Sequence, residues 1–315
     1  MLLCLLALWC VLSPVPRHWP PLGAISPAWL AIAAVGLFLT GMFLLSAGAG
    51  PTEGGGRWLA VITIVAMSLF LVAVLALFLS DLFYIQVQEI FEAMGSAPIL
   101  AAMRLSALTS LAALGIIMLV AIPVGYALSR YRFPGSVLAD SLVDLPMVVP
   151  PLIIGVSLLV FFQTPLGNWI SGTGLEFVYA VKGIVLCQFF ASSSYGIRAA
   201  KAAFDAVDTD LENLALTLGC SPLGAFRRVT LPLARNGLLA AGIIAWAHAV
   251  GLFAPLQVFA GAIRMKTEVM PTAIYLELSI GRIEKALAVS LIMLAMAGVA
   301  LVALHWLAPG RRAPK

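Results

Sequence analysis

The stretch ENLALTLGCSPLGAFRRVTLPLA, residues 212–234, lies between two long apolar segments and carries more local structure than a simple connection needs. Its apolar residues recur at helical spacing and predict a short amphipathic helix. Gly219 favours a stop there, because glycine readily adopts the left-handed conformation that ends many helices. Ser221 and Pro222 form a second start signal, with serine as N-cap and proline in the first turn. The apolar positions of the first helix are Leu211, Leu214, Ala215 and Leu218.

Charges in and around this stretch support two short helices joined at a glycine turn. Negative charge precedes and enters the first helix, where it stabilises the N-terminal end of the helix dipole. Arg227 and Arg228 are predicted to end the second helix, and Leu231-Pro232 to begin the next apolar segment. The acidic residues are Asp205, Asp208, Asp210 and Glu212.

The composition of the chain excludes a water-soluble domain. Of its 315 residues, 62% are hydrophobic and 10% are charged, whereas soluble domains carry about 25% charged residues. The mean hydropathy is +1.08. A bilayer is the solvent that suits such a chain. The net charge of +4 is small, and it predicts loop topology in a membrane rather than a nucleic-acid partner.

Apolar runs of membrane-spanning length predict an all-α, polytopic bundle of about seven or eight transmembrane helices. A span needs about 20 mostly apolar residues. Residues 2–12 form a further, shorter run, which we interpret as a short spanning helix. The seven long runs are 28–50, 58–83, 100–128, 137–162, 178–203, 233–262 and 286–307.

The distribution of Lys and Arg predicts the orientation of the chain. With residues 204–232 on the cytoplasmic side, that side holds more of the 18 Lys and Arg residues than the outside, as membrane proteins favour. The loop 264–285 then faces outward and carries mixed charge. This loop suits contact with an external protein or attraction of an anion, and a plain solvated loop is the alternative.

Carboxylates and helix breakers mark a second region. Asp140 and Asp144 share a helix face and suggest either a proton relay or ion pairs at the cytoplasmic surface, with Arg130 and Arg132 nearby in sequence. Breaks in a spanning helix either shape a transport pathway or are packing kinks buried in protein. The breakers are Pro146, Pro150, Pro151 and Gly155.

The segment NLALTLGCSPLGAFRRVTLP resembles the EAA loop of binding-protein-dependent ABC importer permeases. Asn213-Leu214-Ala215 stands at the Glu-Ala-Ala position of the family pattern, Gly219 at its glycine and Pro232 at its closing proline. Asn213 departs from the usual glutamate, and Glu212 is its neighbour. The resemblance implies a coupling helix that fits a cleft in an ATP-binding subunit. The residues implied in that contact are Asn213, Leu214, Ala215, Gly219, Ser221, Pro222, Phe226, Arg227 and Pro232.

The resemblance extends over roughly residues 100–307. Residues 103–135 and 144–162 are similar to the first conserved spans of the permease core, and 260–293 resembles the end of molybdate, tungstate and sulfate permeases in particular. Gly251-Leu252 departs from the Gly-Glu that oxyanion permeases often carry there. The implied fold is a type I ABC importer permease core.

The resemblance also implies a domain plan and a set of partners. Residues 1–98 would hold extra transmembrane segments and the first core helix, 99–308 the permease core with its cytoplasmic loop 204–232, and 309–315 a short cytoplasmic tail. The partners implied are a cytoplasmic ATP-binding subunit, an external solute-binding protein, membrane lipid and a second permease subunit, expected to be an identical copy. The chain would be a multi-pass protein of the bacterial inner membrane, with the coupling loop and C-terminus in the cytoplasm.

Motif searches predict no catalytic site, cofactor or metal site. The sequence holds no GxxxxGK[ST] phosphate loop, so an ATP-driven transporter would take its ATPase from another chain. The cysteines and histidines lack metal-ligand spacing, and Ser192-Ser193-Ser194 lies within a span, where hydroxyls bond to helix backbones or line a pathway. The alternatives are a permease for another small solute, an ion-coupled secondary transporter and an intramembrane enzyme.

Overall fold

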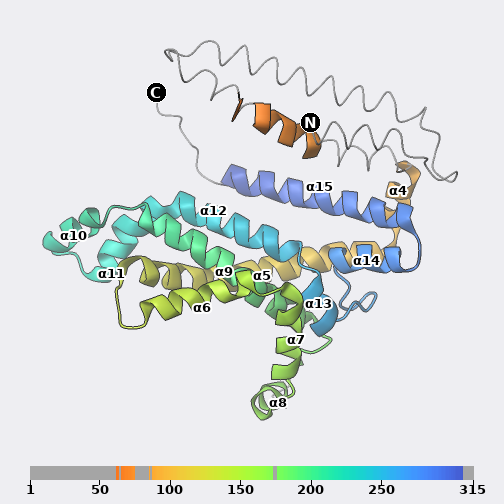
Figure 1. The fold of residues 1–315 in the computed structure, drawn as a ribbon, viewed down its shortest axis with the longest axis horizontal. Helices are drawn as coiled ribbons and strands as arrows, with labels where there is room; N and C mark the ends of the chain where they lie inside the picture. The colour runs from red at the N-terminus through yellow and green to blue at the C-terminus, as the bar shows by residue number, and fades with distance from the viewer. Residues whose placement is uncertain (1–61, 64, 75–84, 86, 173–175, 308–315) are drawn as a thin grey trace. The chain divides into compact units, whose positions relative to one another are not determined.

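The computed structural model describes residues 62, 63, 65–74, 85, 87–172 and 176–307 (Figure 1). The chain divides into two compact units, residues 1–84 and 85–315. In the first unit, an apolar helix covers Val65–Val74, inside the predicted span 58–83. The predicted segments 2–12 and 28–50 and the tail 309–315 lie outside the described residues.

The described part of the second unit is helical and contains no strand, which confirms the all-α class. Its elements follow one another with short connections (Figure 1). In order they are α4 (Val87–Gly95), α5 (Ala97–Arg130), α6 (Ser136–Val148), α7 (Pro151–Phe161), α8 (Pro165–Gly172), α9 (Val181–Asp205), α10 (Thr209–Thr217), α11 (Pro222–Ala225), the π-helix η2 (Phe226–Thr230), α12 (Leu231–Val250), α13 (Ala254–Phe259), α14 (Met270–Ser279) and α15 (Ile283–Leu307).

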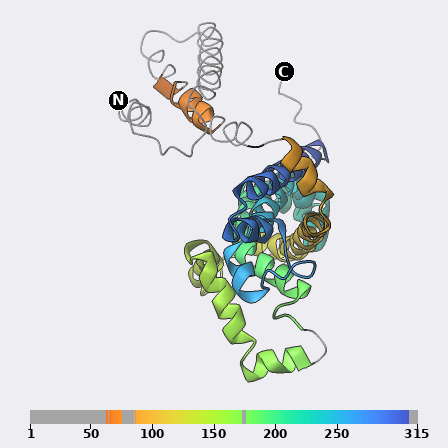
Figure 2. The same ribbon diagram turned by 90° about the vertical axis from the view of Figure 1, so that its right-hand side faces the viewer.

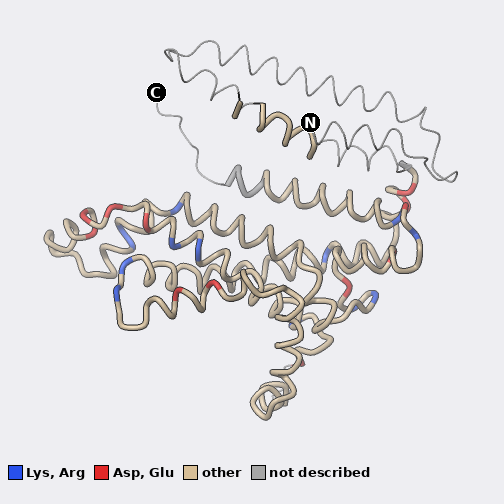
Figure 3. Tube along the Cα trace, in the orientation of Figure 1, with Lys and Arg blue, Asp and Glu red and all other residues tan. Residues whose placement is uncertain are grey.

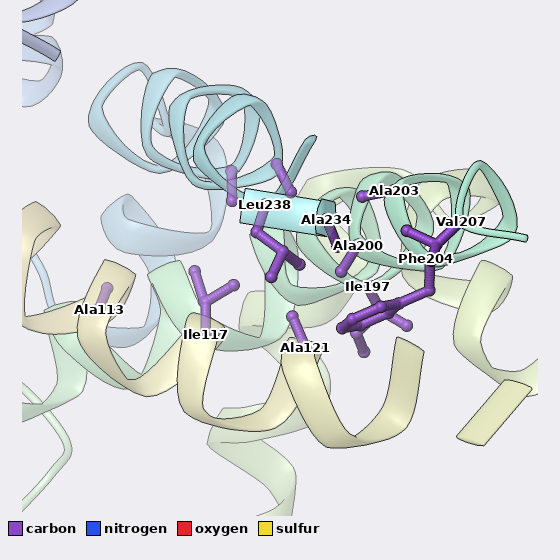
Figure 4. Close-up of a cluster of buried hydrophobic side chains, with 12 residues drawn as sticks. Ala113, Ile117, Ala121, Ile197, Ala200, Ala203, Phe204, Val207, Ala234 and Leu238 are labelled. Carbon is purple, nitrogen blue, oxygen red and sulfur yellow. The ribbon is translucent and has the colours of Figure 1, made fainter. Parts of the chain in front are cut away.

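The largest core cluster joins α5, α9 and α12 through small side chains (Figure 4). Ala121 of α5, Ala200 of α9 and Ala241 of α12 are all fully buried. A Cβ atom at Gly237 would lie 2.4 Å from the Cβ atom of Ala203, closer than real side chains approach. Small residues let helix backbones approach closely, which is how helices associate where lipid offers no hydrophobic drive.

Three described helices are long and apolar enough to cross a membrane: Ala97–Arg130, Pro222–Val250 and Ile283–Val302. The pair α6 and α7 makes a fourth if it is counted as one span, bent by 107°. Charged residues gather toward the two ends of these helices and leave the middle almost uncharged (Figure 3), as a bilayer requires.

Helix α9 lies at the predicted span 178–203 but is not among the three helices that are long and apolar enough to cross a membrane. It packs against α5, α6, α7, α12 and α13. About half of its 25 residues are buried, including the polar Gln188 and Ser192. A helix surrounded by protein does not need the uniform apolar surface that lipid demands, so its sequence is less apolar.

The predicted span 233–262 is wrong at its C-terminal end. Helix α12 ends at Val250, and a separate short helix, α13, begins at Ala254. Pro255 occupies the first turn of α13. A proline inside a continuous helix would clash with the carbonyl four residues earlier, so the helix breaks before it. Hydropathy continues across this break and does not reveal it.

The region 264–285, which was predicted to face outward, is not a plain solvated loop, so that alternative is wrong. It contains α14, whose first residue Met270 donates its backbone N–H to the Ser106 hydroxyl of α5 at 2.8 Å. Met270 and Ala273 are fully buried in a cluster with residues of α5 and α15. Helix α15 begins at Ile283, three residues before the predicted start.

Helix α8 lies at the far end of α7, away from the long helices (Figure 2). Gly167 of α8 packs so closely on α7 that a Cβ atom there would lie 2.3 Å from the Phe161 carbonyl oxygen. The rings of Phe162 and Phe259 contact each other with centres 5.5 Å apart and planes tilted by 41°, which joins the end of α7 to α13. The bend after α6 therefore directs α7 onto α13.

Candidate functional site

The first helix of the candidate coupling loop, α10, stops at the predicted glycine, but Asp205, expected in its early turns, is the last residue of α9. Asp208 is its N-cap and accepts a hydrogen bond from the Asp210 backbone N–H at 3.0 Å. Gly219 follows the helix with φ +87°, and no atom lies within 4 Å of a Cβ built there. The backbone angle alone therefore demands glycine, since other residues rarely adopt it.

The second helix starts at the predicted residues but does not end where predicted. The Ser221 hydroxyl accepts a hydrogen bond from the Gly224 N–H at 3.1 Å, and Pro222 opens α11. The chain then passes through η2 into α12 as one helix, Pro222–Val250. The predicted end at Arg227-Arg228 is wrong. The Leu231 N–H bonds back five residues to Phe226, and this wider turn accommodates Pro232, which has no N–H to donate.

Glu212 fixes the loop to the bundle. Its carboxylate accepts hydrogen bonds from Arg130 Nε at 2.9 Å, from the Thr230 hydroxyl at 2.7 Å and from the Tyr126 hydroxyl at 3.2 Å. The side chains of Arg130 and Glu212 are only 9% and 12% exposed. Arg130 also donates to the Val207 carbonyl at 2.8 Å. Charge-assisted hydrogen bonds of this kind are the strong ones, so Glu212 ties α10 to the end of α5 and to η2.

An aromatic cluster adjoins this anchor. The ring of Tyr126 contacts Phe226 at a centroid distance of 4.7 Å and Phe204 at 5.4 Å, in both cases edge to face. Such contacts stabilise a packed junction beyond the area they bury. The cluster joins α5, α9 and η2 directly beneath the loop.

The other side of the loop presents apolar side chains to its surroundings. Leu214 and Leu218 of the first helix and its turn are 58% and 77% exposed, and Leu223 of α11 is 58% exposed. Of the predicted apolar face, only Ala215 is buried. Exposed leucines grouped on a structured loop mark an interaction site rather than a core.

The structure divides the predicted coupling residues into three groups. Ala215 is buried and Phe226 half-buried, so these two hold the loop together. Gly219, Ser221 and Pro222 shape the turn and the restart. The remaining predicted residues, Asn213, Leu214, Arg227 and Pro232, are exposed, as are Gly219, Ser221 and Pro222.

Asp140 and Asp144 are ion-paired, but not with Arg130 or Arg132. Both carboxylates bind Arg198 of α9, with Asp140 Oδ1 2.9 Å from Arg198 Nη1 and Asp144 in a closer, two-bonded contact. Lys201 lies 3.5 Å from Asp140. Sequence proximity suggested the wrong cations because α9, not the end of α5, packs against α6.

Three of the predicted helix breakers lie at or near the bend. Pro150 caps α7 and Pro151 begins it, whereas Pro146 lies inside α6. The two helices meet at 107°. Gly155 of α7 packs on Pro255, where a Cβ atom would lie 2.7 Å from the Pro255 Cα atom. The bend and this contact bring two interrupted helices, α6–α7 and α12–α13, together.

Charged residues around α14 converge on a buried carboxylate. The Glu277 side chain is 1% exposed and lies 2.7 Å from Arg264, 3.9 Å from Arg282 and 4.0 Å from Lys285. Glu268 is 2% exposed, and neither of its carboxylate oxygens has a hydrogen-bond partner among the described residues. Burial raises the pKa of the Glu268 carboxyl.

Replacing Glu268 with glutamine is expected to stabilise the folded protein at neutral pH by about 1 kcal/mol, because an unpaired buried charge costs more than a neutral amide. A raised pKa means that glutamate stabilises the fold most when protonated and loses this contribution as pH rises through the raised value. The gain in the variant should therefore grow with pH. Thermal unfolding in detergent at pH 5 and pH 8 measures it. Glu284→Gln, at an exposed position nearby, should change little. A Glu268→Gln variant that gains nothing at pH 8 contradicts the prediction.

Within the described residues, no three or more His, Cys, Asp and Glu side chains are grouped to hold a metal ion. The features described above are the loop, the ion cluster of Asp140, Asp144, Arg198 and Lys201, and the two helix breaks. The sequence model of the family described as "Binding-protein-dependent transport system inner membrane component" matches residues 120–313. The chain belongs to this family. It is the permease component of an ABC importer, as the resemblance of its EAA-like loop implied.

Curated relatives of this permease carry the names of oxyanion transporters. It is 34% identical to the molybdate/tungstate transport system permease protein WtpB of Thermococcus kodakarensis, over 59% of this chain and 72% of that protein. It is 32% identical to the molybdenum transport system permease protein ModB of Escherichia coli, over 64% of this chain and 91% of that protein. The sulfate transport system permease protein CysW of Escherichia coli is 28% identical, over 70% and 77%.

Solved structures show the same fold. A bacterial ABC transporter involved in the import of the acidic polysaccharide alginate matches with a TM-score of 0.61 and 16% identity, over 73% of this permease and 85% of that chain. The alginate transporter in complex with a pentasaccharide-bound periplasmic protein matches with a TM-score of 0.62 and 17% identity, over 90% and 95%. The architecture is that of ABC importer permeases.

The anchor of the loop could not be predicted from the sequence. Glu212 was expected to be one of the acidic residues at the start of the first helix and a neighbour of Asn213, and Tyr126, Arg130 and Thr230 had no predicted contact with the loop. Tyr126 and Arg130 lie four residues apart at the end of a span, so they share a helix face. That spacing indicates a polar face near the membrane surface, but not that Glu212 binds to it 82 residues later.

Proposed function

We propose that this permease moves a tetrahedral oxyanion such as molybdate, tungstate or sulfate across the bacterial inner membrane, driven by a separate ATP-hydrolysing subunit. The names of the relatives support this solute class. The alginate transporters share only the fold with this chain, because their identity is below one fifth. We therefore infer the solute class from the more similar oxyanion permeases and not from the alginate transporters.

The docking site of the ATPase is the loop 204–232. The observation that carries this assignment is a structured loop whose leucines, Leu214, Leu218 and Leu223, are exposed while Glu212 anchors its other side. A cleft in the ATPase would cover these leucines, and burial of apolar area would supply the affinity. Asn213 and Arg227 would add polar contacts at the edge of that surface.

Force from the ATPase would reach the spans by two routes. Helix α11 continues through η2 into α12 without a break, so a displacement of α11 moves α12. Helix α10 is tied through Glu212 to Arg130 at the end of α5. Packed helices shift as units between discrete arrangements rather than deforming continuously. Both routes end in the core of α5, α9 and α12. This core would switch between inward-open and outward-open packing. The pathway would run beside the helix breakers Pro146, Pro150, Pro151 and Gly155.

The assembly would contain a second copy of this permease, an ATPase on each loop and an external binding protein that delivers the solute. The coupling loop and the C-terminus would face the cytoplasm, and residues 99–308 would form the permease core. Reconstitution with the ATPase and the binding protein tests the whole proposal. Uptake of radioactive molybdate or sulfate should require ATP hydrolysis, and uptake that continues with an inactive ATPase would contradict it.

Arg227→Glu is expected to weaken association with the ATPase about tenfold, because Arg227 is exposed on the docking surface and its reversal introduces repulsion at a contact. The measurement is the dissociation constant of the purified subunits. Arg132→Glu, which reverses an exposed charge outside the loop, is the control. An equal loss in both variants would indicate a general charge effect and would contradict a specific contact at Arg227.

The secondary-transporter alternative depends on Asp140 and Asp144 as a proton relay. Both carboxylates are held by Arg198, and Asp140 also by Lys201. The ion cluster therefore favours a structural tie between α6 and α9.

A further inference from the structure

A polar group lies within the bundle, near the midpoint of α9. The Ser192 hydroxyl is fully buried and lies 2.9 Å from His248 Nδ1 in the last turn of α12. The Tyr195 ring stacks on the His248 ring with centroids 4.2 Å apart and planes 26° apart. These two contacts hold the imidazole ring from one edge and one face.

Helix α12 ends at Val250, two residues after this histidine, and the end is itself stabilised by a buried side chain. Gln188, one turn before Ser192, donates from Nε2 to the Ala249 carbonyl at 3.1 Å. Its Oε1 atom is buried and has no hydrogen-bond partner among the described residues. Interrupted backbone at membrane depth is tolerated only where protein or water covers it.

The break between α6 and α7 lies against the start of α13, which follows the end of α12. Pro255 of α13 contacts Gly155 of α7, and α7 follows the 107° bend after α6. Two interrupted helices therefore meet beside the polar group of α9 and α12. In transporters, interrupted helices near the membrane midplane are where solutes and ions bind.

His248 has one ring nitrogen left for a solute. Its side chain is half-buried, and the adjacent residues Ile244 and Ala247 on α12 are exposed. In the described part of the chain, Nε2 makes no hydrogen bond. When the Ser192 hydroxyl donates to Nδ1, the ring proton lies on Nε2 and can be donated. Helix α12 carries no Asp or Glu, and the only one in α9 is Asp205 at its end, so no carboxylate on these two helices competes for that proton.

We propose that His248 is a solute-contact residue of the translocation pathway, and that its Nε2–H donates a hydrogen bond to an oxyanion in transit. This inference rests on the proposed function, since it takes the solute to be an oxyanion. Ser192 and Tyr195 keep the ring oriented, so that one donor is presented at a fixed position. Hydrogen bonds to charged oxygen are stronger than neutral ones, and a single one is weak enough to release the solute.

Two isosteric substitutions test this role in the reconstituted permease with its ATPase and binding protein. His248→Asn keeps an amide near the position of Nδ1, within reach of Ser192, but has nothing at the position of Nε2. His248→Gln places an amide N–H close to the position of Nε2. We expect His248→Asn to lower the rate of molybdate or sulfate uptake about tenfold and to change the ratio of the two rates. His248→Gln should keep at least a third of the uptake.

The thermal unfolding midpoints of the variants separate a solute contact from a structural role. We expect both variants to unfold within a few degrees of the wild type. Wild-type uptake by His248→Asn, or an equal loss of uptake and stability in both variants, would overturn the inference while leaving the proposed function in place. A wild-type complex that takes up neither molybdate nor sulfate would overturn both, and this result is visible in the control.

Discussion

Replacing Glu212 with alanine is expected to lower the free energy of unfolding by about 3 kcal/mol and to abolish ATP-driven uptake. The substitution leaves Arg130, which is 9% exposed, without its carboxylate, and it removes the acceptor of Thr230 and Tyr126. Breaking a buried ion pair by removing one partner is strongly destabilising because the other charge stays buried and uncompensated. Thermal or denaturant unfolding in detergent measures the first effect, and uptake in proteoliposomes measures the second.

Two controls isolate the anchor from its surroundings. Asn213→Ala changes the exposed neighbour and should alter stability by less than about 0.5 kcal/mol. Adding Arg130→Met to Glu212→Ala should restore part of the stability, because the buried charge is then removed as well. The double variant should still fail in uptake if the tie between α10 and α5 transmits force. Equal stability of Glu212→Ala and Asn213→Ala would show that Glu212 is not an anchor.

Replacing Gly219 with valine is expected to block coupling while leaving the helical bundle folded. Gly219 has φ +87°, which a β-branched residue adopts only with strain. Left-handed backbone costs other residues about 1–2 kcal/mol, roughly a five- to thirty-fold loss in the population of the native turn. No atom lies within 4 Å of the new Cβ position, so the strain is confined to the backbone of the loop.

Three substitutions at position 219 that differ in backbone strain test this prediction. Asparagine tolerates left-handed backbone better than other residues, so Gly219→Asn should retain most uptake, Gly219→Ala less and Gly219→Val least. ATPase stimulation by the loaded binding protein should follow the same order. The unfolding midpoint of the bundle should not follow it. Wild-type stimulation in Gly219→Val would show that the shape of this turn does not matter for coupling.

The coupling loop shows how far local sequence determines structure. Asp208, Gly219 and Ser221 act on backbone groups within three residues of themselves, so their roles as cap, turn and restart follow from residue type and spacing. The continuity of α11 with α12 was not predicted, because a π-turn and a chain break both suit a proline at position 232. Packing of Phe226 against Tyr126 decides in favour of the continuous helix.

Membrane insertion follows from the sequence alone, since mean hydropathy and the length of apolar runs need no tertiary information. Hydropathy, however, extended one predicted span through Pro255, and it did not show that α9 is a central helix with buried polar residues. Hydropathy reports how apolar a segment is, not whether lipid or protein surrounds it. The breaks and the polar group on α9 emerge only when the helices are packed.

The helical class, the membrane environment and the start and turn signals of the loop can be predicted from the residues alone, because each depends on composition or on residues within one helical turn. The contacts of Glu212 with Arg130, of Asp140 and Asp144 with Arg198, and of His248 with Ser192 become known only when the helices are packed. These partners are separated by more than 50 residues along the chain. Their pairing depends on which helix faces pack together, and no local pattern of residues encodes that choice.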